Sequence, residues 1–236
     1  MIEESRILYT DSSCIIVNKR AGEAAEGAAP GMVSLPEVLG KTFGTGQNAG
    51  GNPFLPTAVH RIDVPVSGCI LFARTPPALT FLNTAFSRRQ AVKTYWAVIE
   101  QNEKIRTIPE SGELRHWIAV DGRRNKSFAF SGPGENRKEA VLRYRVAGAG
   151  DRYCFMEIDL TTGRHHQIRA QLAAEGLFIK GDLKYGARRS ERNGGIRLHA
   201  RFLSFPSPDR PDQYISVTAE PPLPDRLWEA CMQSMV

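Results

Sequence analysis

Short runs of β-branched and aromatic residues, bounded by turn-forming residues, constrain the fold of this chain more than any other feature. The chain begins in this pattern, because two apolar runs at residues 7–9 and 14–17 are separated by Asp-Ser-Ser. Residues 69–73 form a continuous apolar run, which is typical of a central strand. We predict strands at residues 7–9, 14–17, 69–73, 92–99, 140–146, 154–160 and 196–200.

Patterns typical of helices are fewer. One helix is predicted to begin at Pro76, because proline is favoured in the first turn and apolar residues follow at helical spacing. A second helix carries Ile168 and Leu172 and is expected to end at Gly176, and a short one lies near Trp228. This distribution predicts an α+β fold, with a mixed, mainly antiparallel central sheet flanked by helices and loops, rather than alternating β-α-β units.

The length and composition are those of one globular domain. The chain has 236 residues, of which 42% are hydrophobic and 24% charged, so it can bury a sizeable core. We expect a single domain over residues 1–236. Within it, a Gly-rich segment predicts a mobile loop near residues 43–54, and a polar, basic insertion near residues 101–138 predicts irregular hairpins on the surface.

The charge balance favours an anionic partner, because 31 Lys and Arg against 25 Asp and Glu give a net charge of +6. No apolar run approaches the roughly 20 residues of a membrane span, and the first residues lack the pattern of a secretion signal. The four cysteines form no C-x-x-C pair. We therefore expect a cytoplasmic monomer with reduced thiols and no membrane contact.

The densest polar cluster beside a core element is residues 60–63, with the sequence HRID, just before the apolar run at residues 69–73. In an extended chain Arg61 and Asp63 face the same side, while Ile62 points to the other. A reactive carboxylate is one interpretation of this cluster. A surface ion pair of little energetic value is the other.

A second cluster contains an arginine on the apolar face of a predicted helix. Arg169 lies between Ile168 and Leu172, among the residues that should face the core. A buried guanidinium requires a carboxylate partner, because an unpaired buried charge costs several kcal/mol. Asp63 is a candidate partner. Alternatively, Arg169 extends to solvent from the edge of the helix.

The histidines do not predict a metal centre. His165 and His166 are adjacent, so on a helix they point about 100° apart, and no spacing typical of zinc ligands joins them to His60 or His199. The sequence also contains no Gly-rich loop of the kind that holds nucleotide phosphates. We expect neither a metal nor a cofactor.

Three segments together resemble the RluA family of RNA pseudouridine synthases. They are residues 60–68, 93–97 and 163–169, which occur in the family's order and at comparable separations. Supporting similarity lies at residues 7–9, 17–19, 179–186 and 198–200. The resemblance covers the catalytic domain only, without the RNA-binding module of the S4 type that some members carry at the N-terminus.

The resemblance implies isomerisation of uridine to pseudouridine in structured RNA, either ribosomal or transfer RNA, without a cofactor or metal. Asp63 would be the catalytic aspartate, acting either on the sugar or as a base. Arg169 would pair with Asp63, which agrees with the position of Arg169 on its helix. Tyr95 would stack on the target base, and Leu198 would close the pocket from below.

The resemblance also implies how the RNA is held. Arg61 would fill the gap left in the RNA stem when the target nucleotide is extruded, since the sugar–base bond is not accessible inside a stack. Other RNA contacts are implied at His60, Arg164 and Gln167. The basic residues between 106 and 138 and between 188 and 201 would contact phosphates.

Two other functions are considered. One is an RNA-binding protein that keeps the fold without catalysis, although phosphate binding alone does not need a carboxylate such as Asp63. The other is a metal-dependent hydrolase that uses the histidines.

Overall fold

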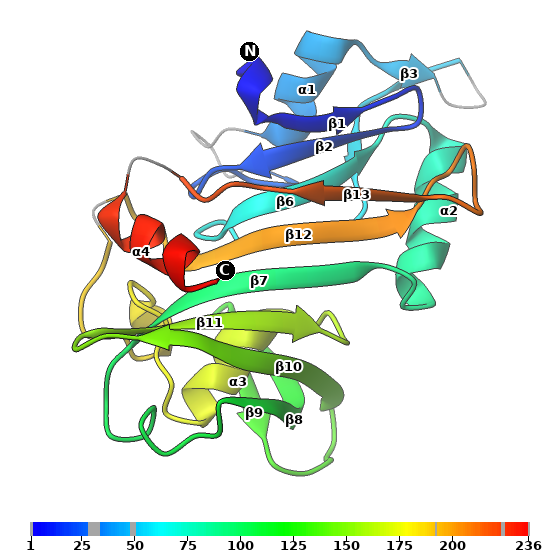
Figure 1. Ribbon diagram of the computed structural model, residues 1–236. Coiled ribbons are helices and arrows are strands. Elements are labelled where there is room, and N and C mark those ends of the chain that lie inside the picture. Colours follow the sequence, from blue (N-terminus) through cyan, green and yellow to red (C-terminus); the bar gives the residue numbers. More distant parts are fainter. Residues whose placement is uncertain (1, 28–33, 48–50, 192, 223–224, 236) are drawn as a thin grey trace. The chain divides into compact units, whose positions relative to one another are not determined.

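The computed structural model describes residues 2–27, 34–47, 51–191, 193–222 and 225–235 (Figure 1). The chain forms two compact units. Unit 1 comprises Met1–Lys93 and Ala200–Pro221, and unit 2 comprises Thr94–His199 and Pro222–Val236. The single domain over residues 1–236 stays a prediction.

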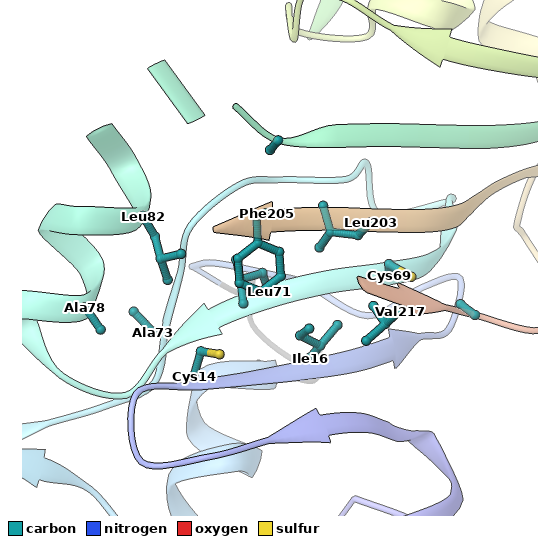
Figure 2. Close-up of a cluster of buried hydrophobic side chains, with 12 residues drawn as sticks. Cys14, Ile16, Cys69, Leu71, Ala73, Ala78, Leu82, Leu203, Phe205 and Val217 are labelled. Carbon is teal, nitrogen blue, oxygen red and sulfur yellow. The ribbon is translucent and has the colours of Figure 1, made fainter. Parts of the chain in front are cut away.

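Unit 1 is built on a mixed, mainly antiparallel sheet that contains several of the predicted strands, and β6 and β12 run in the same direction in it (Figure 2). Its strands follow the order β1-β2-β6-β12, with β5 paired to β6 and β13 paired to β12. Their bounds are β1 Ile7–Thr10, β2 Cys14–Lys19, β5 Thr57–Ala58, β6 Ser67–Ala73, β12 Leu198–Pro206 and β13 Tyr214–Thr218. The run predicted at residues 69–73 is confirmed as a central strand, because every residue of β6 is buried.

Helix α2 (Pro76–Ser87) covers the core of unit 1, as predicted. It begins where expected because Thr75 caps it, accepting a hydrogen bond at 3.3 Å from the backbone N–H of Ala78. Figure 2 shows Leu82 of α2 and Phe205 of β12 in one apolar cluster with Leu71 of β6. Burial of these side chains supplies the main stabilisation of the unit.

The Gly-rich region before β6 contains structure that the sequence does not predict. Helix α1 spans Leu35–Phe43, and two-residue strands β3 (Gly46–Gln47) and β4 (Pro53–Phe54) pair with each other inside the predicted mobile loop. Residues 48–50 of that loop lie outside the described residues. The helix escapes prediction because Gly40 interrupts it, yet a Cβ there would lie 2.5 Å from Leu55.

Unit 2 is built on a second set of antiparallel strands, in the order β7-β11-β10-β8-β9. Their bounds are β7 Val92–Glu100, β8 Ser111–Asp121, β9 Lys126–Phe130, β10 Lys138–Ala149 and β11 Tyr153–Leu160. Helix α3 (Gln167–Ala174) packs against β8 and β9, and helix α4 (Arg226–Ser234) contacts β10. The predicted strands and both helices are confirmed.

The prediction of irregular hairpins at residues 101–138 is wrong. Strand β8 has 11 residues and forms a regular hairpin with β9. Its inward residues His116 and Ile118 alternate with polar outward residues such as Arg115. Because the inward residue His116 is polar and the outward residue Trp117 is apolar, the alternation typical of a strand is broken in the sequence.

Together these elements confirm the α+β class with a mainly antiparallel sheet. All four cysteines are buried and free of disulfides. Among the described residues, no helix is both long and apolar enough to cross a membrane.

Candidate active site

Asp63 lies in a bend of unit 1 between β5 and β6. The backbone N–H of Val66 donates to the carbonyl oxygen of Asp63 at 2.9 Å and closes a turn through Pro65. Ile62 is buried, Arg61 is exposed, and Asp63 is half-buried. The predicted division of this segment between core and surface is therefore confirmed.

A buried lysine holds the bend that carries Asp63. Lys19 at the end of β2 is 0% exposed, and its Nζ donates to the carbonyl oxygens of Arg20 at 3.0 Å, Glu23 at 3.0 Å and Val64 at 3.1 Å. Burial lowers the pKa of Lys19 to about 8, although the carboxylates of Glu23 and Asp63 oppose this shift. Lys19 thus connects the residue next to Asp63 to the central sheet.

His60 is held inside unit 1 as a neutral ring. Its Nε2 accepts from the backbone N–H of Leu71 at 3.3 Å, and the ring stacks on Phe86 with centroids 5.2 Å apart. Burial lowers the pKa of His60 to about 3, and the nearby charge of Lys93 adds to the effect. The predicted RNA contact of His60 stays a prediction.

Arg169 is buried in unit 2, so the expectation that it faces the core is confirmed and the solvent-exposed alternative is wrong. Its side chain is 5% exposed. Nε and Nη2 donate to the two carboxylate oxygens of Asp182 at 2.6 and 2.8 Å, and the guanidinium carbon lies 4.8 Å from the centre of the Tyr185 ring. This partner of Arg169 is not among the residues predicted from the sequence, although Asp182 lies within the similar segment 179–186. The predicted pairing of Arg169 with Asp63 joins residues of the two units and stays a prediction.

Tyr185 connects Arg169 to the start of α3. Its hydroxyl accepts from the backbone N–H of Ser127 at 2.8 Å and lies 2.9 Å from Nδ1 of His166. His166 adopts a left-handed conformation with φ 50° at the N-terminus of α3, which is uncommon for a residue other than glycine. His165 stacks on His166 at 3.9 Å and its Nδ1 lies 2.8 Å from the hydroxyl of Ser127. Both histidines therefore belong to this hydrogen-bonded network.

The N-terminal turn of α3 places Arg164 at the surface. Gln167 is 3% exposed, and its amide oxygen accepts from the hydroxyl of Thr162 at 2.8 Å and from the backbone N–H of Arg164 at 2.9 Å. Its amide nitrogen donates to the carbonyl oxygen of Val141 at 3.1 Å. The amide of Gln167 thus supports the turn from inside, whereas Arg164 is exposed.

The two apolar site residues also lie in unit 2. Tyr95 on β7 is 7% exposed and stands opposite Ile158 of β11. Leu198, at the start of β12, is 3% exposed. Their predicted contacts with the target base stay predictions. Across the described residues, no group of three or more His, Cys, Asp or Glu side chains is placed to hold a metal ion.

Comparisons with known proteins agree on one family. Residues 13–174 match the family model described as RNA pseudouridylate synthase. An uncharacterized RNA pseudouridine synthase of Zymomonas mobilis is 31% identical over 228 residues, which cover 93% of this chain and 94% of the relative. Ribosomal large subunit pseudouridine synthase D of the same organism is 27% identical over 86% of this chain and 65% of the relative.

Solved structures agree on the fold. The human RNA pseudouridylate synthase domain containing 4 aligns with a TM-score of 0.71 at 21% identity, over 98% of this chain and 93% of the human chain. The human RNA pseudouridylate synthase domain containing 1 aligns with a TM-score of 0.70 at 22% identity, over 97% and 86% of the two chains.

Proposed function

Because the chain belongs to the RNA pseudouridylate synthase family, we propose that Asp63 is the catalytic residue with which it isomerises uridine in RNA to pseudouridine. The observation that carries this role is the bend at Asp63, which leaves the carboxylate half-buried while Lys19 holds the adjacent Val64 carbonyl. A carboxylate that reacts with a nucleotide must be both accessible and fixed. The bend provides both conditions.

The reaction conserves every atom of the nucleotide. The bond between N1 and C1′ breaks, the uracil turns, and a bond forms between C5 and C1′ while C5 loses a proton and N1 gains one. No electrons pass to or from another molecule, so the balance needs no redox cofactor. Asp63 acts in its ionised form, whether it attacks the sugar or removes a proton.

We propose that Arg169 pairs with Asp63 and fixes the orientation of its carboxylate. A guanidinium has five N–H donors in one plane, and Asp182 accepts from two of them. One arginine can therefore serve two carboxylates. The bidentate contact with Asp182 fixes the orientation of the Arg169 guanidinium.

The target nucleotide must leave the RNA stack to reach Asp63. Arg61 is exposed two residues before Asp63, which supports a role in filling the gap that the extruded base leaves. Tyr95 then stacks on the base, and Leu198 supplies an apolar floor below it. Both side chains are suited to contact with a planar ring.

The remaining predicted RNA contacts divide into direct and indirect ones. Arg164 is exposed and we assign it to a phosphate of the RNA. His60 and Gln167 hydrogen-bond within the protein, so they act by holding their neighbours Arg61 and Arg164.

The substrate that we propose is a structured RNA, ribosomal or transfer, on which a cytoplasmic monomer acts. The relative named ribosomal large subunit pseudouridine synthase D supports ribosomal RNA as the first to test. Residues 101–138 serve as a basic insertion that contacts this RNA.

Pseudouridine mapping with carbodiimide on total RNA transcribed without modifications tests the proposal. We expect a new reverse-transcription stop with the wild-type protein and with Asp212→Asn, an exposed aspartate of the same unit, but not with Asp63→Asn. An equal signal with Asp63→Asn would assign catalysis to another residue. No signal from any variant, with RNA still bound, would favour a non-catalytic RNA-binding protein.

A further inference from the structure

The outer face of the β8–β9 hairpin carries aromatic side chains that do not enter the core. Phe128 and Phe130 on β9 are 38% and 36% exposed. Phe130 stands opposite Trp117 of β8, and Phe128 opposite Ala119, so these side chains share one face of the hairpin. The neighbouring residue Ser127 is buried on the other face, toward the α3 network. We call the outer surface formed by Trp117, Phe128, Phe130, Lys126 and Arg137 the aromatic-basic face.

Cations accompany each exposed ring of the aromatic-basic face. The guanidinium carbon of Arg137 lies 3.7 Å from the centre of the Phe130 ring. Nζ of Lys126 lies 5.6 Å from the centre of the Phe128 ring and 5.0 Å from that of Tyr185. These distances are within the range of cation–π interactions. In the part of the chain that the structure describes, neither cation forms an ion pair with a carboxylate.

Arginines on the rest of this sheet are neutralised. Arg115 pairs with Glu113 and Glu139, Arg143 with Glu113 at 3.4 Å, and Arg145 with Glu157 at 3.3 Å. The outward faces of β8, β10 and β11 therefore carry balanced charge. The β9 end of the sheet therefore combines exposed aromatic side chains with two cations, Lys126 and Arg137, that have no paired carboxylate among the described residues.

We propose that the aromatic-basic face binds a single-stranded segment of the RNA substrate by stacking unpaired bases on Phe128 and on the Arg137–Phe130 pair. Planar aromatic rings and guanidinium groups both stack on bases, and every base presents a flat face, so such contacts tolerate different sequences. Lys126 is then placed to contact the phosphates between stacked bases. A surface used for phosphates alone would have no use for exposed phenylalanines.

The proposal rests on RNA as the substrate of the family and is independent of the role of Asp63. It differs from the phosphate contacts expected from the basic composition of residues 101–138, because it requires the bases themselves. RNA that lacks bases must therefore lose the contribution of the aromatic-basic face.

Fluorescence anisotropy with two labelled probes tests this difference. One probe is an oligouridine of about 12 nucleotides, and the other is an abasic oligonucleotide of the same length and charge. We expect the double variant Phe128→Ala/Phe130→Ala to bind oligouridine about ten-fold more weakly than wild type. Its affinity for the abasic probe should change by less than about two-fold.

Three controls keep the result specific. Tyr214→Ala removes a 55% exposed aromatic side chain of unit 1 and should leave both affinities unchanged. Phe128→Tyr/Phe130→Tyr keeps the rings and should retain oligouridine binding, whereas unchanged affinity of the alanine variant for the abasic probe excludes a folding defect in that variant. Arg143→Gln removes an arginine that is paired with Glu113 and should leave both affinities nearly unchanged. Because the readout is RNA affinity and not pseudouridine formation, a failure of the catalytic assignment does not affect this test.

Unchanged oligouridine affinity in the alanine variant would overturn the proposal, as would an equal loss for both probes. Sedimentation of the wild type and the alanine variant without RNA completes the test. If only the wild type self-associates and the RNA affinities do not differ, the aromatic-basic face binds a second copy of the chain instead.

Discussion

At the scale of single residues, the sequence predicts burial better than it predicts partners. Arg169 could be assigned to the core because its helix places it between Ile168 and Leu172. Asp182 could not be found in this way, because it lies 13 residues further along the chain in a segment without periodicity. Lys19 gives no signal either, since a lysine at the end of a strand normally extends to solvent.

Substitution of Asp182 should lower both the stability and the activity of the protein. Asp182→Asn leaves a buried guanidinium without its anionic partner, so we expect a loss of about 3–5 kcal/mol in the free energy of unfolding, together with loss of activity. Denaturant unfolding measures the first effect and pseudouridine formation the second. Asp159→Asn, at an exposed aspartate of the same unit, should change little.

A double variant separates the structural role of this pair from its functional role. Arg169→Met/Asp182→Leu replaces both charges by apolar groups, so we expect it to recover much of the stability lost in Asp182→Asn. Its activity should remain absent, because the variant removes the guanidinium that we propose as the partner of Asp63. Recovery of activity together with stability would show that Arg169 serves only the fold.

Because His60 is buried as a neutral ring, we expect the free energy of unfolding to decrease in acid. Its pKa is about 3 in the folded protein, compared with an ordinary value of 6.5, so below pH 6.5 the unfolded chain binds a proton that the folded chain does not. Stability from this group is complete above pH 6.5 and falls by about 1.4 kcal/mol per pH unit as the pH decreases toward 3. Unfolding of wild type and His60→Gln should show a shallower slope for the variant. Parallel slopes would contradict the prediction.

At the scale of elements, Gly68 sets how closely two strands approach beside the Asp63 bend. It has φ 116°, and a Cβ there would lie 2.2 Å from the carbonyl oxygen of Ala200 on β12. Because the obstacle is backbone rather than a flexible side chain, Gly68→Ala must displace one strand. We expect strong destabilisation, by about 3 kcal/mol or more. Gly122→Ala, where no atom lies within 4 Å, should leave the melting temperature nearly unchanged.

Strands and helices with a clear local sequence pattern could be predicted. Elements whose sequence pattern is interrupted could not. Strand β6 is entirely apolar, and α2 has a clear start at Pro76. Strand β8 has the polar His116 on its inward side and the apolar Trp117 on its outward side, so its sequence does not show the alternation typical of a strand. Helix α1 contains Gly40, whose low helix propensity is offset by tertiary packing that no local pattern records.

At the scale of the whole molecule, net charge alone does not locate the RNA. Several of the 31 basic residues form ion pairs with the 25 acidic ones, so only some cations are available to phosphates. We expect Lys126→Gln/Arg137→Gln to reduce the slope of log affinity for oligouridine against log salt concentration by about 0.7 for each cation. Arg143→Gln removes a cation already paired with Glu113 and should reduce it less. Equal reductions would contradict the assignment of available cations to the aromatic-basic face.

Lys19 also allows opening of the Asp63 bend to be followed by chemical labelling. An amine with a pKa of about 8 is a good nucleophile near that pH, but the amine of Lys19 is enclosed and bound to carbonyl oxygens of Arg20, Glu23 and Val64. An acylating reagent should therefore modify the exposed lysines at once and Lys19 only when the bend opens. The rate at which Lys19 becomes acylated would then time the opening of the segment that carries Asp63.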